Sequence, residues 1–163
     1  MISAGPIVQT AWVVEDIGAS EQFFVDNFGV TRWTRIPDVA FGPADCTYRG
    51  EPADFVAHIA LTYVGEMQFE LISPVRGESI YTEFLARGGP GLHHVCFEPA
   101  DYAAAVVAAE TAGVPVVQAG SMGGGAMDFA YVDGAAWGVP YVELVRLGES
   151  MTEFYAAVRE QSR

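Results

Sequence analysis

The stretch GLHHVCFEPADYAAAVVAAETAG, residues 91–113, decides the fold. It reads as a strand, then an aspartate at a helix N-cap position, then a helix that ends at a glycine. The N-terminal stretch IVQTAWVVEDIGASEQFFVDNFG, residues 7–29, repeats these signals in the same order. The two capping aspartates, Asp16 and Asp101, are 85 residues apart. Such a repeat indicates a duplicated strand-and-helix unit.

Three more strands are expected after each copy, which gives two βαβββ modules. They are residues 31–35, 55–64 and 67–73 in the first half and 114–120, 127–133 and 140–147 in the second. We expect an α+β fold in which module 1 (about 7–75) and module 2 (about 91–147) pair within one domain over residues 1–150. Pairing would bury the sheet faces that the helices leave open.

The remaining segments are assigned by their turn and cap signals. A short helix is expected at 79–86, and the turn-rich stretch 36–54 is expected to be a surface loop. Residues 150–163 are expected to form a C-terminal helix that begins with a capping box of Ser150 and Glu153. The pattern leaves open whether this helix packs on the body or acts as a lid.

The composition of the chain excludes several classes of function and partner. The chain has 163 residues, of which 51% are hydrophobic, and its formal net charge is −13. A surface this acidic argues against nucleic-acid and membrane partners. All eight basic residues are arginine, and the absence of lysine excludes Schiff-base chemistry and a Walker phosphate loop. The start shows no secretory signal, and the two cysteines cannot build a disulfide framework, so we expect a cytoplasmic protein.

Two carboxylates stand in the middle of apolar strands, Glu70 in MQFELI and Glu143 in PYVELV. Burying a carboxylate costs several kcal/mol unless it is paired or binds a metal. The period-two geometry of strands also places Gln9 and His94 on equivalent faces, while His93 points toward the helices. Gln9, Glu70, His94 and Glu143 would supply one imidazole nitrogen and three oxygens. This set suits one divalent ion such as zinc, cobalt, nickel or manganese.

Four segments carry a family resemblance. They are QTAWVVEDIGASEQFF, FELISP, FLARGGPGLHHVCFEPADY and YVELV. Together they resemble the vicinal oxygen chelate superfamily of glyoxalases, bleomycin-resistance proteins and extradiol dioxygenases, closest to its methylmalonyl-CoA epimerase and glyoxalase I branch. The resemblance implies a half-open mixed β-barrel with helices outside. It also implies one metal ligand from each of four strands, at Gln9, Glu70, His94 and Glu143.

The chain also departs from these relatives. Glyoxalase I has arginines for glutathione where this chain has Val13 and Pro90. The segment before Glu143 contains Trp137 and no cation, which favours an apolar or aromatic substrate over methylmalonyl-CoA. The dioxygenases need two histidines and a carboxylate for iron, and only His94 is suitably placed.

We therefore expect an isomerase, epimerase or lyase that removes a proton next to a metal-polarised carbonyl. Glu143 would be the base and Glu70 its partner. The substrate would be a small apolar or acyl-thioester compound that contacts Trp137, Tyr141 and His58. Three alternatives stay open: a metal-free ligand-binding protein of the bleomycin-resistance type, a lactoylglutathione lyase and, less favoured, an extradiol-type dioxygenase. A homodimer is also compatible with the sequence.

Overall fold

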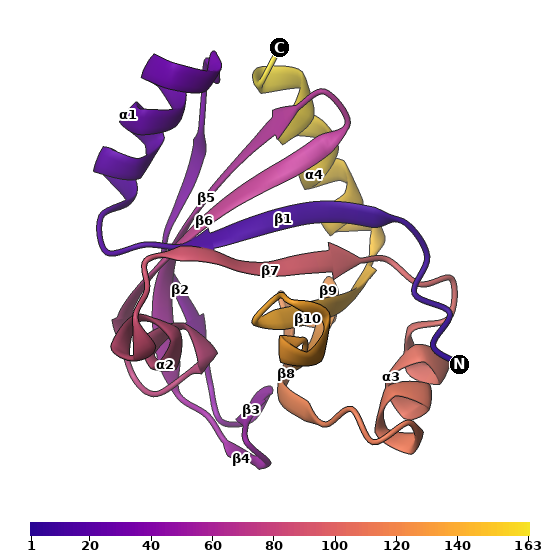
Figure 1. Ribbon diagram of the computed structural model, residues 1–163. Helices are drawn as coiled ribbons and strands as arrows, with labels where there is room; N and C mark the ends of the chain where they lie inside the picture. The colour runs from indigo at the N-terminus through magenta and orange to yellow at the C-terminus, as the bar shows by residue number, and fades with distance from the viewer.

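One curled, mixed sheet of ten strands dominates the computed structural model, which describes residues 1–163. The strand order is β2-β5-β6-β1-β7-β10-β9-β8-β3-β4 (Figure 1). The strands are β1 (Ile7–Val13), β2 (Thr34–Phe41), β3 (Cys46–Tyr48), β4 (Glu51–Pro52), β5 (Phe55–Val64), β6 (Met67–Arg76), β7 (Gly91–Phe97), β8 (Val116–Met122), β9 (Met127–Asp133) and β10 (Tyr141–Leu147). The α+β half-barrel expected from the sequence is confirmed.

Four α-helices and one short 3₁₀ helix lie around this sheet (Figure 1). They are α1 (Ile17–Phe28), α2 (Ile80–Arg87), α3 (Tyr102–Thr111), η1 (Ala135–Trp137) and α4 (Glu149–Gln161). Helix α1 packs on β5 and β6, α3 packs on β8 and β10, and α4 contacts β5. None of the helices is long and apolar enough to cross a membrane.

The two halves of the chain meet at β1 and β7, which pair antiparallel. Strand β1 also pairs parallel with β6, and β7 pairs parallel with β10. The four strands that carry Gln9, Glu70, His94 and Glu143 are therefore consecutive neighbours, in the order β6-β1-β7-β10. The register places Ala11 opposite both Glu70 and His94. This pairing brings together residues far apart in the sequence.

Of three helix caps predicted from the sequence, two are confirmed and one is wrong. Asp16 and Asp101 each accept a hydrogen bond from a backbone N–H of the first helical turn, at 3.0 Å, as expected. At α4 the expected capping box is wrong, because the N-cap is Gly148 and no side chain caps it. The N–H of Gly148 donates to the carbonyl of Ala126 at 2.8 Å, which fixes the chain reversal before Ser150 is reached.

The stretch expected to be a loop, residues 36–54, instead contains most of β2 together with β3 and β4. Pro37 and Asp38 resemble a turn in sequence, but they lie at an irregularity of β2, and an edge strand tolerates proline. Strand β3 pairs with β8 at the opposite end of the sheet. The ring of Phe41 stacks on Phe55 and meets the edge of Phe129, so this segment joins the two ends of the half-barrel.

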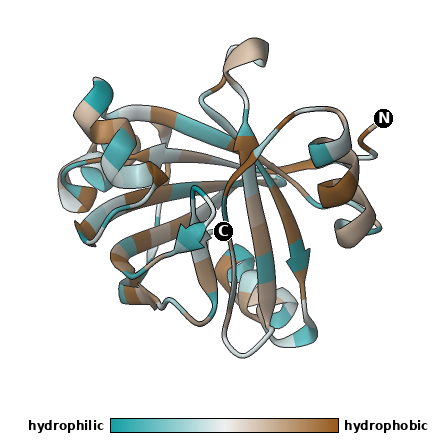
Figure 2. Ribbon diagram, turned by 90° about the horizontal axis from the view of Figure 1, so that it is seen from below, coloured by the Kyte–Doolittle hydropathy of each residue, from teal (hydrophilic) through white to brown (hydrophobic).

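The main hydrophobic core fills the concave side of the sheet and includes Val13, Phe55, Ile72, Ile80 and Tyr131. Apolar and polar residues alternate along several strands, as Figure 2 shows. This alternation gives each strand one face toward the core. The buried polar side chains of the next section lie among these apolar residues.

Candidate functional site

Three buried side chains from β1, β6 and β10 converge on one imidazole nitrogen of β7. The Nε2 atom of His94 lies 3.3 Å from Oε1 of Gln9 and 3.2 Å from Oε2 of Glu143. Oε2 of Glu70 lies 3.6 Å from the same nitrogen. The exposed fractions are 4% for Gln9, 8% for Glu70, 0% for His94 and 2% for Glu143. The structure thus brings together the four residues that the sequence suggested as a donor set.

Three of these side chains border a cavity of about 60 Å³ inside the half-barrel. Gln9, Glu70 and Glu143 are its polar walls. The other walls are aliphatic, aromatic and thioether side chains: Ile36, Val39, Phe41, Ile59, Leu61, Tyr81, Met122, Met127, Phe129, Tyr131, Met151, Phe154 and Tyr155. No arginine lines the cavity, so the two carboxylates face a mostly apolar space without a cationic side chain.

The electrostatics of the cavity follow from burial. Burial, and then the charge of Glu143, raise the pKa of Glu70 well above its ordinary value. Burial likewise raises the pKa of Cys96, and the charge of Glu143 adds to this effect. A thiol of this kind is not a nucleophile at neutral pH, in agreement with its sequence context.

His93 is a fully buried neighbour of His94. Its ring packs against Tyr81 and Phe84 of α2. The expectation that His93 points to the face opposite His94 is wrong, because the β1–β7 register is irregular here and skips His93 between Leu92 and His94. In addition, its Nδ1 atom lies 2.9 Å from Nδ1 of His94. Such a bond needs one protonated and one bare nitrogen. If His94 donates, its Nε2 atom carries a lone pair toward the cavity.

Gln68 is a buried residue beside the site that sequence reasoning missed. The amide nitrogen of Gln9 donates to Oε1 of Gln68 at 2.7 Å, and Nε2 of Gln68 donates to the Tyr63 hydroxyl at 3.1 Å. Gln68 is 3% exposed and pairs with Gln9 in the β1–β6 register. The available signal was its position two residues before Glu70, on the same strand face.

The three residues expected to bind substrate do not line this cavity. His58 precedes Ile59 on β5, and since Ile59 faces the cavity, His58 faces away and accepts from the N–H of Asp38. Trp137 is 58% exposed on η1. Tyr141 is buried, but its hydroxyl donates to Glu83 at 3.2 Å instead of reaching the cavity.

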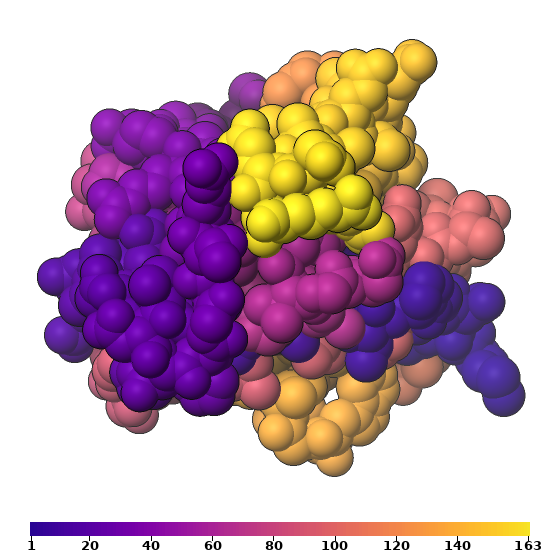
Figure 3. Space-filling view, turned by 90° about the horizontal axis from the view of Figure 1, so that it is seen from above, coloured from indigo at the N-terminus to yellow at the C-terminus, as the bar shows by residue number.

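Helix α4 supplies Met151, Phe154 and Tyr155 to the cavity wall. Figure 3 shows its atoms in yellow, lying across this face of the molecule between the first and second halves of the chain. Its far end is tied to β5, since the Tyr63 N–H donates to Oγ of Ser162 at 3.1 Å. The C-terminal helix therefore closes one side of the cavity as well as packing on the sheet.

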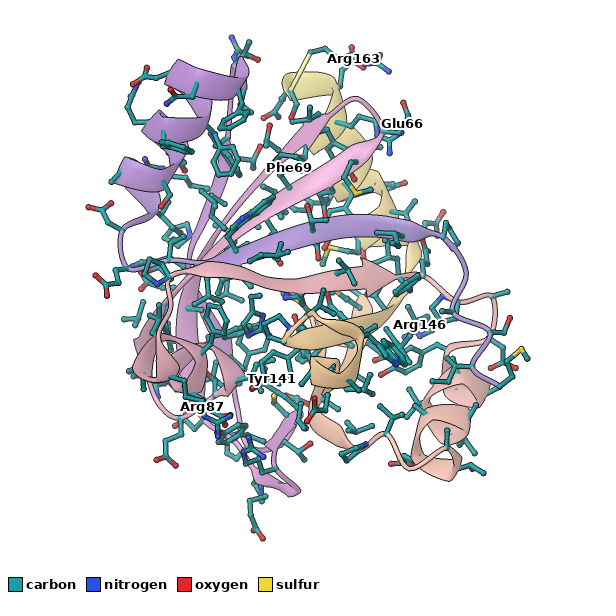
Figure 4. The ribbon with its side chains drawn as sticks, viewed as in Figure 1. Glu66, Phe69, Arg87, Tyr141, Arg146 and Arg163 are labelled. Carbon is teal, nitrogen blue, oxygen red and sulfur yellow. The ribbon has the colours of Figure 1, made fainter.

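Glu83 of α2 organises a polar cluster beside the site. It accepts hydrogen bonds from Arg49 at 2.7 Å, from the Tyr141 hydroxyl and from the Tyr48 hydroxyl, and it pairs with Arg87 at 2.7 Å. Figure 4 shows Arg87 and Tyr141 at this lower end of the molecule. Although burial opposes it, the hydrogen bonds from Arg49 and Tyr48 lower the pKa of Glu83. The cluster ties β3 to α2 and β10.

The donor set fits a divalent cation on chemical grounds. It offers one imidazole nitrogen, one amide oxygen and two carboxylates, a mixture that zinc and its neighbours accept. Two buried carboxylates in a space without an arginine leave negative charge that a cation would neutralise. The structure does not show a formed cluster of three or more histidine, cysteine, aspartate or glutamate side chains at metal-binding spacing. The fit therefore rests on donor chemistry and burial.

Comparison with known proteins adds three findings. Residues 8–131 match the model of the Glyoxalase/Bleomycin resistance protein/Dioxygenase superfamily. A hypothetical protein from Bacillus halodurans C-125 superposes with a TM-score of 0.66 at 20% identity, covering 88% of this chain and 95% of its own. No curated protein matches the chain.

Methylmalonyl-CoA epimerases are also among the similar solved structures. A single-residue variant of the enzyme from Streptomyces coelicolor has a TM-score of 0.60 at 20% identity and covers 90% of this chain and 97% of its own. The enzyme from Mycobacterium tuberculosis has a TM-score of 0.60 at 17% identity and covers 94% and 97%. At these identities the likeness shows a shared fold.

Proposed function

Since this chain belongs to the Glyoxalase/Bleomycin resistance protein/Dioxygenase superfamily, we propose that it is a metal-dependent isomerase, epimerase or lyase. The reaction would remove a proton next to the carbonyl of a small apolar or acyl-thioester substrate. One observation carries the proposal: Glu70 and Glu143 are buried together around His94 in an otherwise apolar cavity. The fold likeness to methylmalonyl-CoA epimerases supports an epimerase type of reaction.

The four donors Gln9, Glu70, His94 and Glu143 would hold the ion. A divalent cation bound there would supply Lewis-acid polarisation of a carbonyl oxygen. Glu143 would accept the proton from the α-carbon, and Glu70 would be the second carboxyl group that carries a proton at the site. Both carboxyl groups border the cavity, so a substrate carbon held there can be reached by either one.

The apolar walls of the cavity would contribute in two further ways. Side chains such as Phe129, Met127 and Leu61 exclude water, which strengthens the interaction of a carboxylate with the proton it receives. They also select a substrate whose body near the carbonyl is apolar. No arginine lies on the wall to pair with a phosphate or carboxylate group inside the cavity.

Exchange of substrate hydrogen with deuterium oxide tests this function. Wild-type protein loaded in turn with zinc, cobalt, nickel or manganese is expected to label the α-carbon of an apolar ketone or acyl thioester. Glu143→Gln is expected to reduce exchange at least about 100-fold, because general-base catalysis contributes about 10²–10⁴-fold. Glu66→Gln, which changes an exposed carboxylate, is the matched control and is expected to exchange normally. Equal exchange in both variants would remove Glu143 from the role of base.

A second function, a metal-free protein that holds an apolar ligand, is favoured by the aliphatic and aromatic walls of the cavity. Elemental analysis of protein purified without chelators separates the two. The enzyme is expected to contain about one divalent ion per chain. A protein without metal that still binds an apolar fluorescent probe stoichiometrically would favour the binding function.

A further inference from the structure

We propose that Gln68 is a positioning residue that turns the side-chain amide of Gln9 so that its oxygen faces the donor centre. This inference rests on the proposed function, because it concerns how one of the four donors is presented to a cation. Gln68 itself does not border the cavity. It acts through Gln9, which it contacts from the neighbouring strand β6.

The argument begins with the two ends of an amide. A glutamine side chain carries an acceptor oxygen and a donor NH₂ group, and a half-turn about its last bond exchanges them. Only the oxygen can be a ligand, since the NH₂ group has no lone pair to offer. In the structure, Oε1 of Gln9 faces His94 at 3.3 Å, and Nε2 points the other way.

Gln68 occupies the position that decides between these two orientations. Its Oε1 atom accepts from Nε2 of Gln9 at 2.7 Å, in a contact that is buried on both sides. Turning the Gln9 amide over would set two acceptor oxygens against each other. It would also direct an NH₂ group toward the centre, so the observed orientation is the one that presents an oxygen.

A second bond holds Gln68 in turn. Its Nε2 atom donates to the hydroxyl of Tyr63 at 3.1 Å. Tyr63 is anchored to α4, because its backbone N–H donates to Ser162 and the guanidinium of Arg159 lies 4.6 Å from its ring centre. The orientation of one donor is thus connected through two hydrogen bonds to Tyr63, and through the contacts of Tyr63 to the helix that closes the cavity.

Cobalt(II) titration of purified apoprotein, followed by visible absorption, tests the inference without measuring activity. Gln68→Met keeps the size of the side chain and removes the acceptor. We expect it to bind Co²⁺ about 10–100-fold more weakly than wild type, the usual effect of losing an outer partner of a metal ligand, with an altered d–d spectrum. Gln68→Glu retains an acceptor oxygen and is expected to restore the wild-type spectrum.

The matched control is Gln118→Met, which changes another buried glutamine. Gln118 is 1% exposed, and its Oε1 atom accepts from the N–H of Ile80 at 3.1 Å at the start of α2. This variant is expected to lose thermal stability while its Co²⁺ affinity stays within about twofold of wild type. A loss of affinity in Gln68→Met alone would therefore separate positioning from general loosening of the fold.

Two results would overturn the inference in different ways. If Gln68→Met binds Co²⁺ with wild-type affinity and spectrum, Gln68 does not position Gln9, and the proposed function stands. If wild-type protein binds no Co²⁺, the proposed function fails and this inference fails with it. Should Gln68→Met not fold, Tyr63→Phe decides: removal of the hydroxyl is expected to weaken Co²⁺ binding about threefold to tenfold, and unchanged binding overturns the inference.

Discussion

At the scale of single residues, two of the four proposed donors could be identified from the sequence for a local reason. A carboxylate amid apolar strand residues is costly wherever the strand lies, so Glu70 and Glu143 stand out without coordinates. The partners of the donors were not accessible in this way. Gln68 meets Gln9 across 59 residues, through a register between strands that only the assembled sheet defines.

At the same scale, the expected substrate residues do not reach the cavity, for a geometric reason. His58 is on the correct strand but one residue out of step with Ile59, which faces the cavity. The hydroxyl of Tyr141 donates a hydrogen bond to Glu83 and does not face the cavity. Composition fixes neither the face of a strand on which a residue lies nor the partner that a hydroxyl group binds. The apolar residues of the cavity wall come from β2, β5, β8 and β9 and from helices α2 and α4.

Cysteine reactivity gives a prediction at this scale. Burial raises the pKa of the Cys46 thiol to about 11, and its side chain is nearly inaccessible. At pH 8 about one thiol in a thousand is ionised at such a pKa, and thiolate is the reactive form. We expect iodoacetamide to leave both cysteines of the folded protein unmodified for hours at pH 8, and to alkylate both in urea, as measured by intact mass. Rapid alkylation of folded protein would contradict the burial.

At the scale of elements, helix boundaries were predicted well where one side chain makes the cap. Asp16 and Asp101 cap α1 and α3 from their own positions, with no help from distant residues. The boundary of α4 was missed because a contact with Ala126 sets it. The stretch 36–54 was missed because its strands lie at the two ends of the sheet: β2 forms one edge, and β3 and β4 are the last two strands at the other.

Cap substitutions test this distinction. Asp101→Ala is expected to lower the free energy of unfolding by about 1 kcal/mol, because a backbone N–H of α3 loses its acceptor. Ser150→Ala is expected to change it by less than about 0.5 kcal/mol, since Ser150 lies inside α4 and does not cap it. Urea unfolding followed by circular dichroism measures both. A larger cost for Ser150→Ala would indicate that a capping box forms in solution.

The Glu83 cluster gives a second prediction for elements. Glu83→Gln removes the charge that Arg49 and Arg87 share, at a side chain that is only 11% exposed. We expect a loss of about 1–3 kcal/mol in the free energy of unfolding, from hydrogen bonds to a charged group. Glu66→Gln breaks a pair in which Glu66 is 86% exposed, so it is expected to cost less than about 1 kcal/mol. Equal costs in urea unfolding would show that the cluster does not join these elements.

At the scale of the whole molecule, duplication made the pairing of the halves predictable. The repeat offset indicates two similar sheets, and burial of their open faces requires them to meet. Closure of the barrel was not predictable, since it depends on Phe41 reaching Phe129 and on where α4 lies. The size of the cavity depends on that closure.

Thiol and phenol groups whose pKa is raised by burial make the free energy of unfolding decrease at alkaline pH. Burial raises the pKa of Cys46 to about 11 and that of Tyr102 to about 12, from ordinary values of 9.0 and 10.0. Between the ordinary pKa and the raised pKa of each group, the unfolded chain binds fewer protons than the folded one. The free energy of unfolding therefore decreases as pH rises through this range. We expect the urea midpoint to be steady from about pH 7 to 8.5 and to decrease progressively above about pH 9. A midpoint that stays constant to about pH 11 would contradict this.

The division of donors between the halves has a consequence for how such a chain can change over generations. Gln9 and Glu70 come from the first half, and His94 and Glu143 come from the second. Neither half alone presents more than two of the four, so an ancestral single unit would have needed a twin to complete the centre. Variation within one half is therefore constrained by what its counterpart retains.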